Sequence, residues 1–114
     1  MKEIAVGNRY ALAIYEIAKE LNRVEDMYKE LKIVMETYEL NIDFKNFINH
    51  PLVKKDDKKE FISKVFSKEV SGETMNLLHY LIDKTRLAQI KAIVTEYLKL
   101  YYERNQIVEA EATF

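Results

Sequence analysis

The sequence predicts an all-α protein in which six helices form a bundle. The 114 residues include only two glycines and one proline, which leaves few of the residues that hairpins and tight turns need. Over most of the chain, apolar residues recur at steps of three and four, the spacing of a helix with one buried side. With 48% hydrophobic and 32% charged residues, the composition suits one domain with a core and a charged surface.

The first predicted helix runs from about Ile4 to Leu21, and its apolar surface is unusually wide. One side carries Tyr10, Ile14, Ile17 and Leu21. The adjacent side carries Ala11, Tyr15 and Ala18. A surface helix in a small bundle needs a single apolar stripe a little over about 100° wide. This helix can therefore pack on its own core and still offer a face to a partner.

The second predicted helix follows Asn22 and ends near Leu40. Asn22 is the predicted N-cap, because Glu25 three residues later completes a capping-box pattern. The apolar residues of this helix form one stripe that faces the core: Val24, Met27, Tyr28, Leu31, Val34, Met35 and Tyr38. We expect no surplus apolar surface here.

Two short helices are predicted next. Asp43 is the expected cap of a third helix that runs through Ile48 and ends at His50-Pro51, since the residue before a proline disfavours helical geometry. A fourth helix carries Asp56 and Asp57 in its first turn, where negative charge suits the helix dipole. Its expected buried side consists of Phe61, Ile62, Val65 and Phe66.

The fifth predicted helix, from about Glu73 to Lys84, follows a break at Ser71-Gly72 and shares the wide apolar surface of the first. More than half of its circumference is covered by Thr74, Met75, Leu77, Leu78, Tyr80, Leu81 and Ile82. Its polar side is formed by Asn76, His79 and Asp83. Two helices with surplus apolar surface indicate a groove between them, and such grooves bind amphipathic partner helices.

The sixth predicted helix runs from about Leu87 to Arg104, with one stripe made of Leu87, Ile90, Ile93, Val94, Tyr97, Leu98 and Tyr101. The tail then changes period, because Val108, Ala110, Ala112 and Phe114 alternate with polar residues. Such alternation predicts a strand, and a single strand has no pairing partner among six helices. We therefore expect a helical domain over residues 1–106 and the start of a second, truncated domain at 107–114.

Composition also excludes several function classes. Without cysteine, disulfides, thiolate nucleophiles and cysteine-ligated zinc are impossible. A net charge of −1 argues against a nucleic-acid partner, and no apolar run approaches the length of about 20 residues that spans a membrane. The two histidines, His50 and His79, lack metal-ligand spacing, and His79 is expected to face solvent. We expect no catalytic residues, no metal and no cofactor, and we therefore expect that the chain is not an enzyme.

Four blocks occur in a particular order along the chain: Arg9–Ala18, His50–Val53, Met75–Ile82 with Arg86-Leu87, and Ile107–Thr113. Together, in this order, they resemble the delta subunit family of bacterial F-type ATP synthase, whose mitochondrial counterpart is the oligomycin sensitivity conferral protein. Two positions depart from the family pattern. Thr85 and Asn105 stand where glycine is usual, both at expected loop positions.

The resemblance implies a six-helix N-terminal domain in a non-catalytic subunit of the peripheral stalk, the stator of the synthase. This domain would bind the N-terminal helix of an alpha subunit between the first and fifth helices. It would thereby link the catalytic head to the stalk during proton-driven ATP synthesis. The missing C-terminal domain would meet the stalk's b subunit. The complex would lie at the cytoplasmic face of a bacterial plasma membrane, with this subunit peripheral and not inserted.

We expect eight residues to bind the alpha-subunit helix: Tyr10, Ala13, Ile14, Ile17, Leu77, Tyr80, Leu81 and Lys84. Lys84 would be a contact at the rim. We expect five others to serve the core instead: Ala11, Tyr15, Ala18, Leu78 and Ile82. The alternative is a generic helical adaptor, which would use the same groove to dock an amphipathic helix of another partner.

Overall fold

The structure, a computed structural model, describes residues 2–105. These residues form six α-helices and one short 3-10 helix, η1, at Leu87–Gln89. The α-helices are α1 (Lys2–Glu20), α2 (Val24–Leu40), α3 (Ile42–Asn49), α4 (Lys55–Phe66), α5 (Gly72–Asp83) and α6 (Ile90–Asn105). The predicted all-α, six-helix fold is confirmed. The strand expected at 108–114 and the domain boundary after residue 106 lie outside the described residues.

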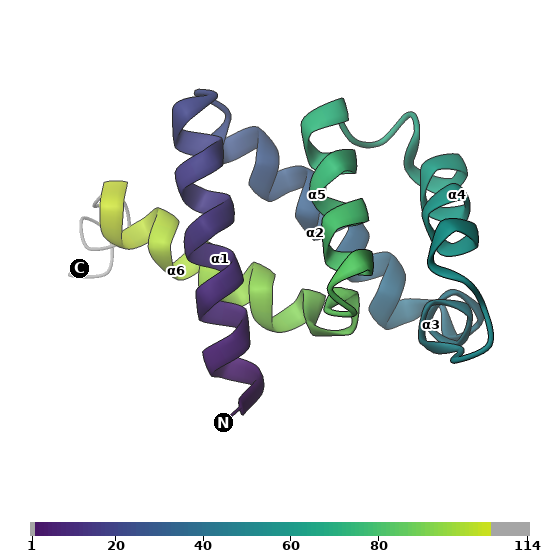
Figure 1. The fold of residues 1–114 in the computed structure, drawn as a ribbon. Helices are drawn as coiled ribbons and strands as arrows, with labels where there is room; N and C mark the ends of the chain where they lie inside the picture. Colours follow the sequence, from purple (N-terminus) through teal and green to yellow (C-terminus); the bar gives the residue numbers. More distant parts are fainter. Residues whose placement is uncertain (1, 106–114) are drawn as a thin grey trace.

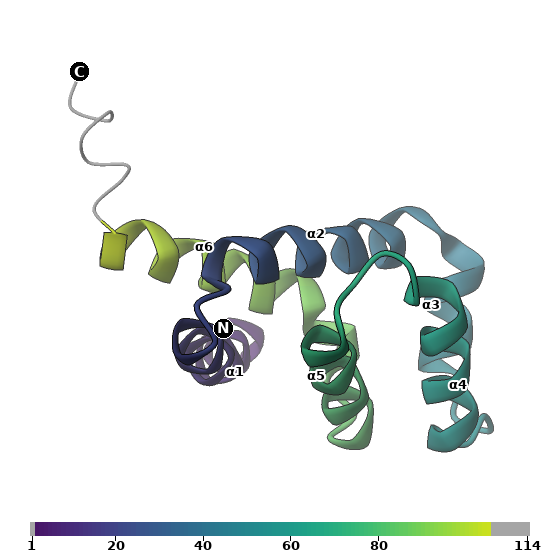
Figure 2. The same ribbon diagram turned by 90° about the horizontal axis from the view of Figure 1, so that it is seen from above.

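The helices form two layers. In Figure 1, α1, α5 and α4 run side by side, while α2 and α6 cross behind them. Figure 2 shows the same arrangement from above, with α2 and α6 on one side of the core and α1, α5 and α4 on the other. α1 packs most extensively on α6, and α5 packs most extensively on α4. The two helices with surplus apolar surface are thus anchored on different neighbours. None of the helices described is both long and apolar enough to cross a membrane.

The core between the layers follows the predicted stripes. The five residues expected to serve the core from the first and fifth helices are all buried, which confirms that prediction: Ala11, Tyr15, Ala18, Leu78 and Ile82. Tyr97 of α6 is fully buried, with the ring of Tyr15 edge-on at 5.6 Å and that of Tyr28 stacked at 6.4 Å. Its hydroxyl donates a hydrogen bond of 2.7 Å to the carbonyl of Val24. Tyr97 therefore ties α6 to both α1 and α2.

The cap predicted for the second helix is wrong. Asn22 does not begin α2 but follows the end of α1 in a left-handed conformation (φ 61°), which asparagine adopts more readily than most residues. The N-cap is Arg23, whose side chain makes no capping hydrogen bond. Glu25 instead lies 3.8 Å from Lys29 in an exposed ion pair one helical turn along.

The expectation for the third and fourth helices also needs two corrections. The cap of α3 is Asn41, not Asp43, because the Asn41 side chain accepts a hydrogen bond of 3.0 Å from the N–H of Phe44. Asp43 lies in the first turn, where its charge still suits the dipole. Val65 of α4, expected to be buried, is 39% exposed.

α1 and α6 cross at very short range, and the only glycine within α1 lies at that crossing. A methyl group added to Gly7 would lie 2.8 Å from Cβ of Ala92 and 2.9 Å from its backbone carbonyl carbon. Real Cβ atoms essentially never come this close to another heavy atom. The absence of a side chain at Gly7 thus sets how closely the two helix backbones approach.

Replacing Gly7 by alanine is therefore expected to destabilise the fold. Alanine is favoured over glycine in a helix by about 1 kcal/mol. Overpacking against a backbone costs roughly 1–3 kcal/mol, so the expected net loss is about 1 kcal/mol. Urea denaturation would measure it. Gly72→Ala is the matched control, since nothing lies within 4 Å of that position, and it should not destabilise. Equal stability of the Gly7→Ala variant and the parent chain would contradict the close crossing.

Candidate helix-docking groove

An apolar groove of about 420 Å³ lies between α1 and α5. We call it the α1/α5 groove. It is lined by Arg9, Tyr10, Ala13, Ile14, Ile17, Asn76, Leu77, Tyr80 and Leu81. Seven of the eight predicted partner-binding residues are among them, and the structure brings these seven together around one hollow.

The lining residues divide into a floor and two walls. Ile14 and Leu81 are 3% and 0% exposed, so they form the floor and also belong to the core. Ile17 and Tyr80 are 42% and 48% exposed and form parts of opposite walls. Ala13, with only a methyl side chain, leaves room between the walls. A partner would therefore contact the walls over most of its area and the floor only at its deepest side chains.

Two tyrosines meet across one part of the α1/α5 groove. The ring of Tyr10 from α1 lies 6.3 Å from that of Tyr80 from α5, at an angle of 58°. Lys84, the eighth predicted residue, does not line the groove. Its ammonium group lies 5.6 Å from the centre of the Tyr80 ring, within the range of a cation–π interaction. Lys84 is exposed, and it lies next to Tyr80 on the outer side of the wall that α5 forms.

The sequence analysis missed two polar residues of the lining. Asn76 was placed on the polar side of the fifth helix and Arg9 was not among the expected binding residues, yet both contribute to the α1/α5 groove. Helical spacing was the available signal, since Arg9 precedes Ala13 by four residues and Asn76 precedes Tyr80 by four. Residues four apart share a face, so a polar residue at that distance from a groove residue lies on the groove side. These two groups can form hydrogen bonds with polar atoms at the edge of a partner.

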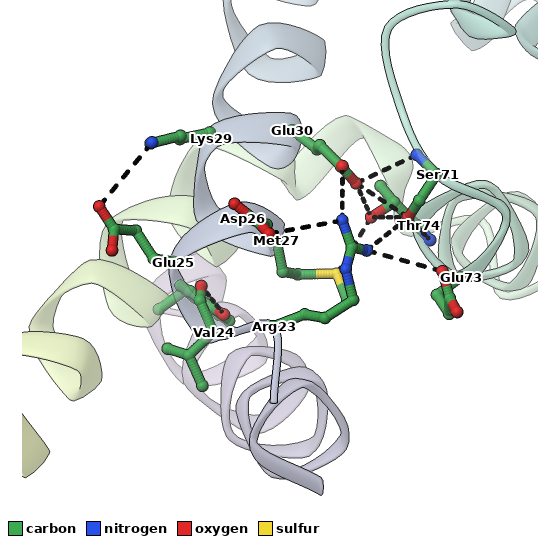
Figure 3. A network of polar contacts seen from close by, with 11 residues as sticks. Arg23, Val24, Glu25, Asp26, Met27, Lys29, Glu30, Ser71, Glu73 and Thr74 are labelled. Carbon is green, nitrogen blue, oxygen red and sulfur yellow. Dashed lines mark hydrogen bonds and ion pairs between the residues drawn. The ribbon is translucent and has the colours of Figure 1, made fainter. Parts of the chain in front are cut away.

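A set of polar contacts holds the first turn of α5 at one end of the groove (Figure 3). We call it the α5 cap cluster, and it consists of Arg23, Glu30, Ser71 and Thr74. The Glu30 carboxylate accepts hydrogen bonds from the hydroxyl of Thr74 at 2.5 Å and from the hydroxyl and N–H of Ser71 at 3.0 and 3.2 Å. Arg23 donates to Glu30 at 2.9 Å and to the Ser71 hydroxyl at 2.7 Å. The cluster thus joins the start of α2 to the start of α5.

The α5 cap cluster favours the ionised form of Glu30. Burial by itself raises the pKa of this carboxyl group. The hydrogen bonds from Thr74, Ser71 and Arg23 act in the opposite direction and together prevail, so the pKa lies below its ordinary value. A carboxyl group whose pKa is lower in the folded state stabilises the fold above its unfolded-state pKa. That contribution is lost as pH falls through the lowered pKa.

This linkage predicts how the Glu30→Gln variant responds to pH. At neutral pH we expect the variant to be less stable than the parent by about 1–2 kcal/mol, because hydrogen bonds to a charged group are lost. Below the ordinary glutamate pKa of about 4.3 the difference should shrink, since the parent carboxyl group also becomes neutral. Urea denaturation of both proteins across this range would measure it. A difference that stays constant down to strongly acidic pH would contradict the lowered pKa.

The opposite end of α5 is held by α4. Lys59 lies 2.7 Å from the Asp83 carboxylate, and Lys55 donates a hydrogen bond of 2.7 Å to the Asp83 carbonyl. The hydrogen bond from Lys59 is the main reason why the pKa of Asp83 lies below its ordinary value. His79, expected to face solvent, is half-buried with its Nε2 atom 3.0 Å from the Ser63 hydroxyl. That expectation is wrong, and the histidine is a further contact between α4 and α5.

Within residues 2–105 the structure brings together no group of three or more histidine, cysteine, aspartate or glutamate side chains that could hold a metal ion. The chemistry that the α1/α5 groove offers is instead the burial of apolar surface, with Arg9 and Asn76 as polar groups at its edge.

Comparison with known proteins gives a consistent result. The sequence model of the ATP synthase delta (OSCP) subunit matches residues 6–114. The chain is 54% identical over 114 residues to the ATP synthase subunit delta, sodium ion specific, of Ilyobacter tartaricus, and 49% identical over 114 residues to that of Propionigenium modestum. It is 44% identical over 109 residues to the ATP synthase subunit delta of Fusobacterium nucleatum. The first two alignments cover all of this chain and 65% of each relative, and the third covers 96% of the chain and 62% of the relative.

Proposed function

Because the chain belongs to the ATP synthase delta (OSCP) subunit family, we propose that its α1/α5 groove binds the N-terminal helix of an alpha subunit. The chain would act as a structural part of the peripheral stalk and carry out no catalysis. By holding an alpha subunit, it links the catalytic head to the stalk, so that the head does not turn with the rotor.

One observation carries this proposal. Seven residues selected from helical periodicity and from the resemblance line a single apolar groove, and they come from two helices that are anchored on different neighbours. An α-helix with its side chains is about 10–12 Å across. Its apolar stripe, at positions i, i+3, i+4 and i+7, is what a groove with two apolar walls accepts. The small side chain of Ala13 supports this fit, since it lets a partner backbone approach α1 closely.

The remaining parts of the proposal concern the whole complex. The chain spans less than two thirds of the length of the relatives it matches, and we propose that the further C-terminal part of such a subunit contacts the b subunit of the stalk. The complex would lie at the cytoplasmic face of a bacterial membrane, with this subunit attached peripherally. The names of two relatives specify sodium ions. The stalk would therefore serve a synthase whose rotor is driven by sodium ions or by protons.

An NMR titration tests the groove directly. The isotope-labelled chain is titrated with a synthetic peptide that copies the first residues of the alpha subunit from the same synthase. We expect saturable shifts of the backbone amide signals within residues 10–17 and 77–84, because those residues surround the α1/α5 groove. A peptide of the same composition with its apolar positions scrambled is the control and should cause no saturable shifts.

Two outcomes would contradict the proposal. If the folded chain shows no shifts at high peptide concentration, the groove does not bind the alpha-subunit helix, and the generic helical adaptor becomes the favoured function. If saturable shifts occur only in α3 and α4, the alpha subunit binds this domain at a different surface.

A further inference from the structure

We propose that Glu30 is a positioning residue for the α1/α5 groove: through the α5 cap cluster it fixes the distance between the two walls at one end. This inference rests on the proposed function of the groove, and it concerns a residue that does not line the groove itself. Glu30 lies on α2, and none of the residues expected to bind a partner comes from that helix.

The position of α5 relative to α1 is set indirectly. α1 packs mainly on α6, whereas α5 packs mainly on α4 and also on α2. The ring contact between Tyr10 and Tyr80 joins the two walls toward the C-terminal end of α5. At that same end, Lys55 and Lys59 of α4 hold Asp83. The N-terminal end of α5 needs a separate anchor if the groove is to keep its width along its whole length.

The α5 cap cluster is that anchor. Ser71 is the N-cap of α5, and its hydroxyl accepts a hydrogen bond of 3.3 Å from the N–H of Thr74. Glu30 binds both of these residues, so it fixes the capping residue and the first turn together. The Thr74 side chain is completely buried, and its hydroxyl points at the Glu30 carboxylate and at Sδ of Met27, 3.2 Å away. A buried hydroxyl that loses its acceptor is costly, which resists any displacement of α5.

Arg23 connects this anchor to the other wall. It follows the turn that ends α1, and its guanidinium lies 2.9 Å from Glu30, 2.7 Å from the Ser71 hydroxyl and 3.6 Å from the Glu73 carboxylate. The end of α1 and the start of α5 are thus joined through Arg23 and Glu30, as Figure 3 shows. Glu30 is 16% exposed as a side chain and so is enclosed by this set of donors.

The first experiment measures the groove without a partner. The chain has no cysteine, so spin labels can be placed only where cysteines are introduced, at Glu20→Cys in α1 and Asn76→Cys in α5. Electron spin resonance then gives the distance distribution between the labels. We expect Glu30→Ala to broaden this distribution or shift it to longer distances. Thr74→Val, which replaces the hydroxyl by a methyl group of similar size, should act in the same direction.

Glu25→Ala is the matched control. Glu25 lies on the same helix and carries the same charge, but its only ion pair is the exposed one with Lys29 among the pairs that the structure describes. This control should leave the distance distribution unchanged. If Glu30→Ala, checked to be folded by circular dichroism, gives the distribution of the parent, the inference is overturned.

The second experiment measures binding of the alpha-subunit peptide. We expect the dissociation constant to rise roughly threefold to tenfold in Glu30→Ala and to stay unchanged in Glu25→Ala, since coupling of this kind is typically modest. Glu30→Gln, which keeps an acceptor oxygen, should recover part of the affinity. Unchanged affinity in a folded Glu30→Ala chain overturns the inference. A parent chain that binds no peptide contradicts the proposed function instead, and the spin-label distances then decide whether Glu30 sets the width of the groove.

Discussion

Replacing Tyr10 by aspartate is expected to weaken binding of the alpha-subunit peptide by roughly tenfold or more while leaving the domain folded. Tyr10 is half-buried in the wall of the α1/α5 groove, with its ring 6.3 Å from that of Tyr80. Large aromatic residues in such positions often account for a large share of the binding free energy. A carboxylate in the same place would lose its water when the peptide binds, and that desolvation is costly. In the free domain the half-exposed site keeps it hydrated.

Isothermal titration calorimetry would give the affinity, and circular dichroism would confirm the fold. Tyr102→Asp is the control, because Tyr102 is an exposed tyrosine on α6 and does not line the groove. It should bind the peptide as the parent does. Unchanged affinity of the Tyr10→Asp variant would remove Tyr10 from the site.

Replacing Leu81 by alanine is expected to reduce the free energy of unfolding by about 2–5 kcal/mol. Leu81 is 0% exposed, so the truncation leaves a cavity in the core beneath the groove as well as losing buried apolar area. Any effect on peptide binding should be secondary, since this side chain has no exposed surface in the free domain. Chemical denaturation with urea, followed by circular dichroism, would measure the loss.

Leu77→Ala separates the two roles. Leu77 lies four residues earlier on α5 and lines the same groove, but it is only partly buried. Its truncation should therefore reduce peptide affinity more, and stability less, than the truncation of Leu81. Equal stability of the Leu81→Ala variant and the parent would mean that the side chain at this position is not part of the core.

The helices could be predicted from the sequence because the spacing of the apolar residues within each helix shows which side is buried. In α2 and α6 the apolar residues follow one stripe, and the buried residues Met27, Leu31, Ile90 and Ile93 all come from it. This spacing can be recognised within one helix, without knowing which helix packs against it. The existence of a groove could be predicted for the same reason, since α1 and α5 have more apolar surface than one contact requires.

The division of that surface could not be predicted. Ile14 and Ile17 share one side of α1, yet the first is buried and the second is 42% exposed. Leu81 and Tyr80 differ in the same way on α5. Which of two neighbouring apolar residues becomes floor and which becomes wall depends on how each helix is rotated against its neighbours, and packing in three dimensions sets that rotation.

The contacts of the α5 cap cluster could not be predicted from the sequence either. Glu30 and Ser71 are 41 residues apart and carry no spacing that links them. The cap of α3 was misplaced because Asn41 and Asp43 both favour caps and lie close together, so local patterns do not decide between them. The cap of α2 was misplaced because the N-cap of that helix is Arg23, whose side chain makes no capping hydrogen bond and so leaves no capping signal in the sequence. Only the folded geometry shows which side chain reaches a free backbone N–H.

The short distance between α1 and α6 at Gly7 has a mechanical consequence. Two helices separated by long side chains can slide slightly as those side chains change rotamer, whereas close-packed backbones transmit strain. A force on the α1 wall therefore passes through Gly7 and Ala92 directly into α6. The α5 wall is held by hydrogen bonds at its first turn and by lysines at its last. When a partner in the groove is pulled, we therefore expect α1 to be displaced less than α5.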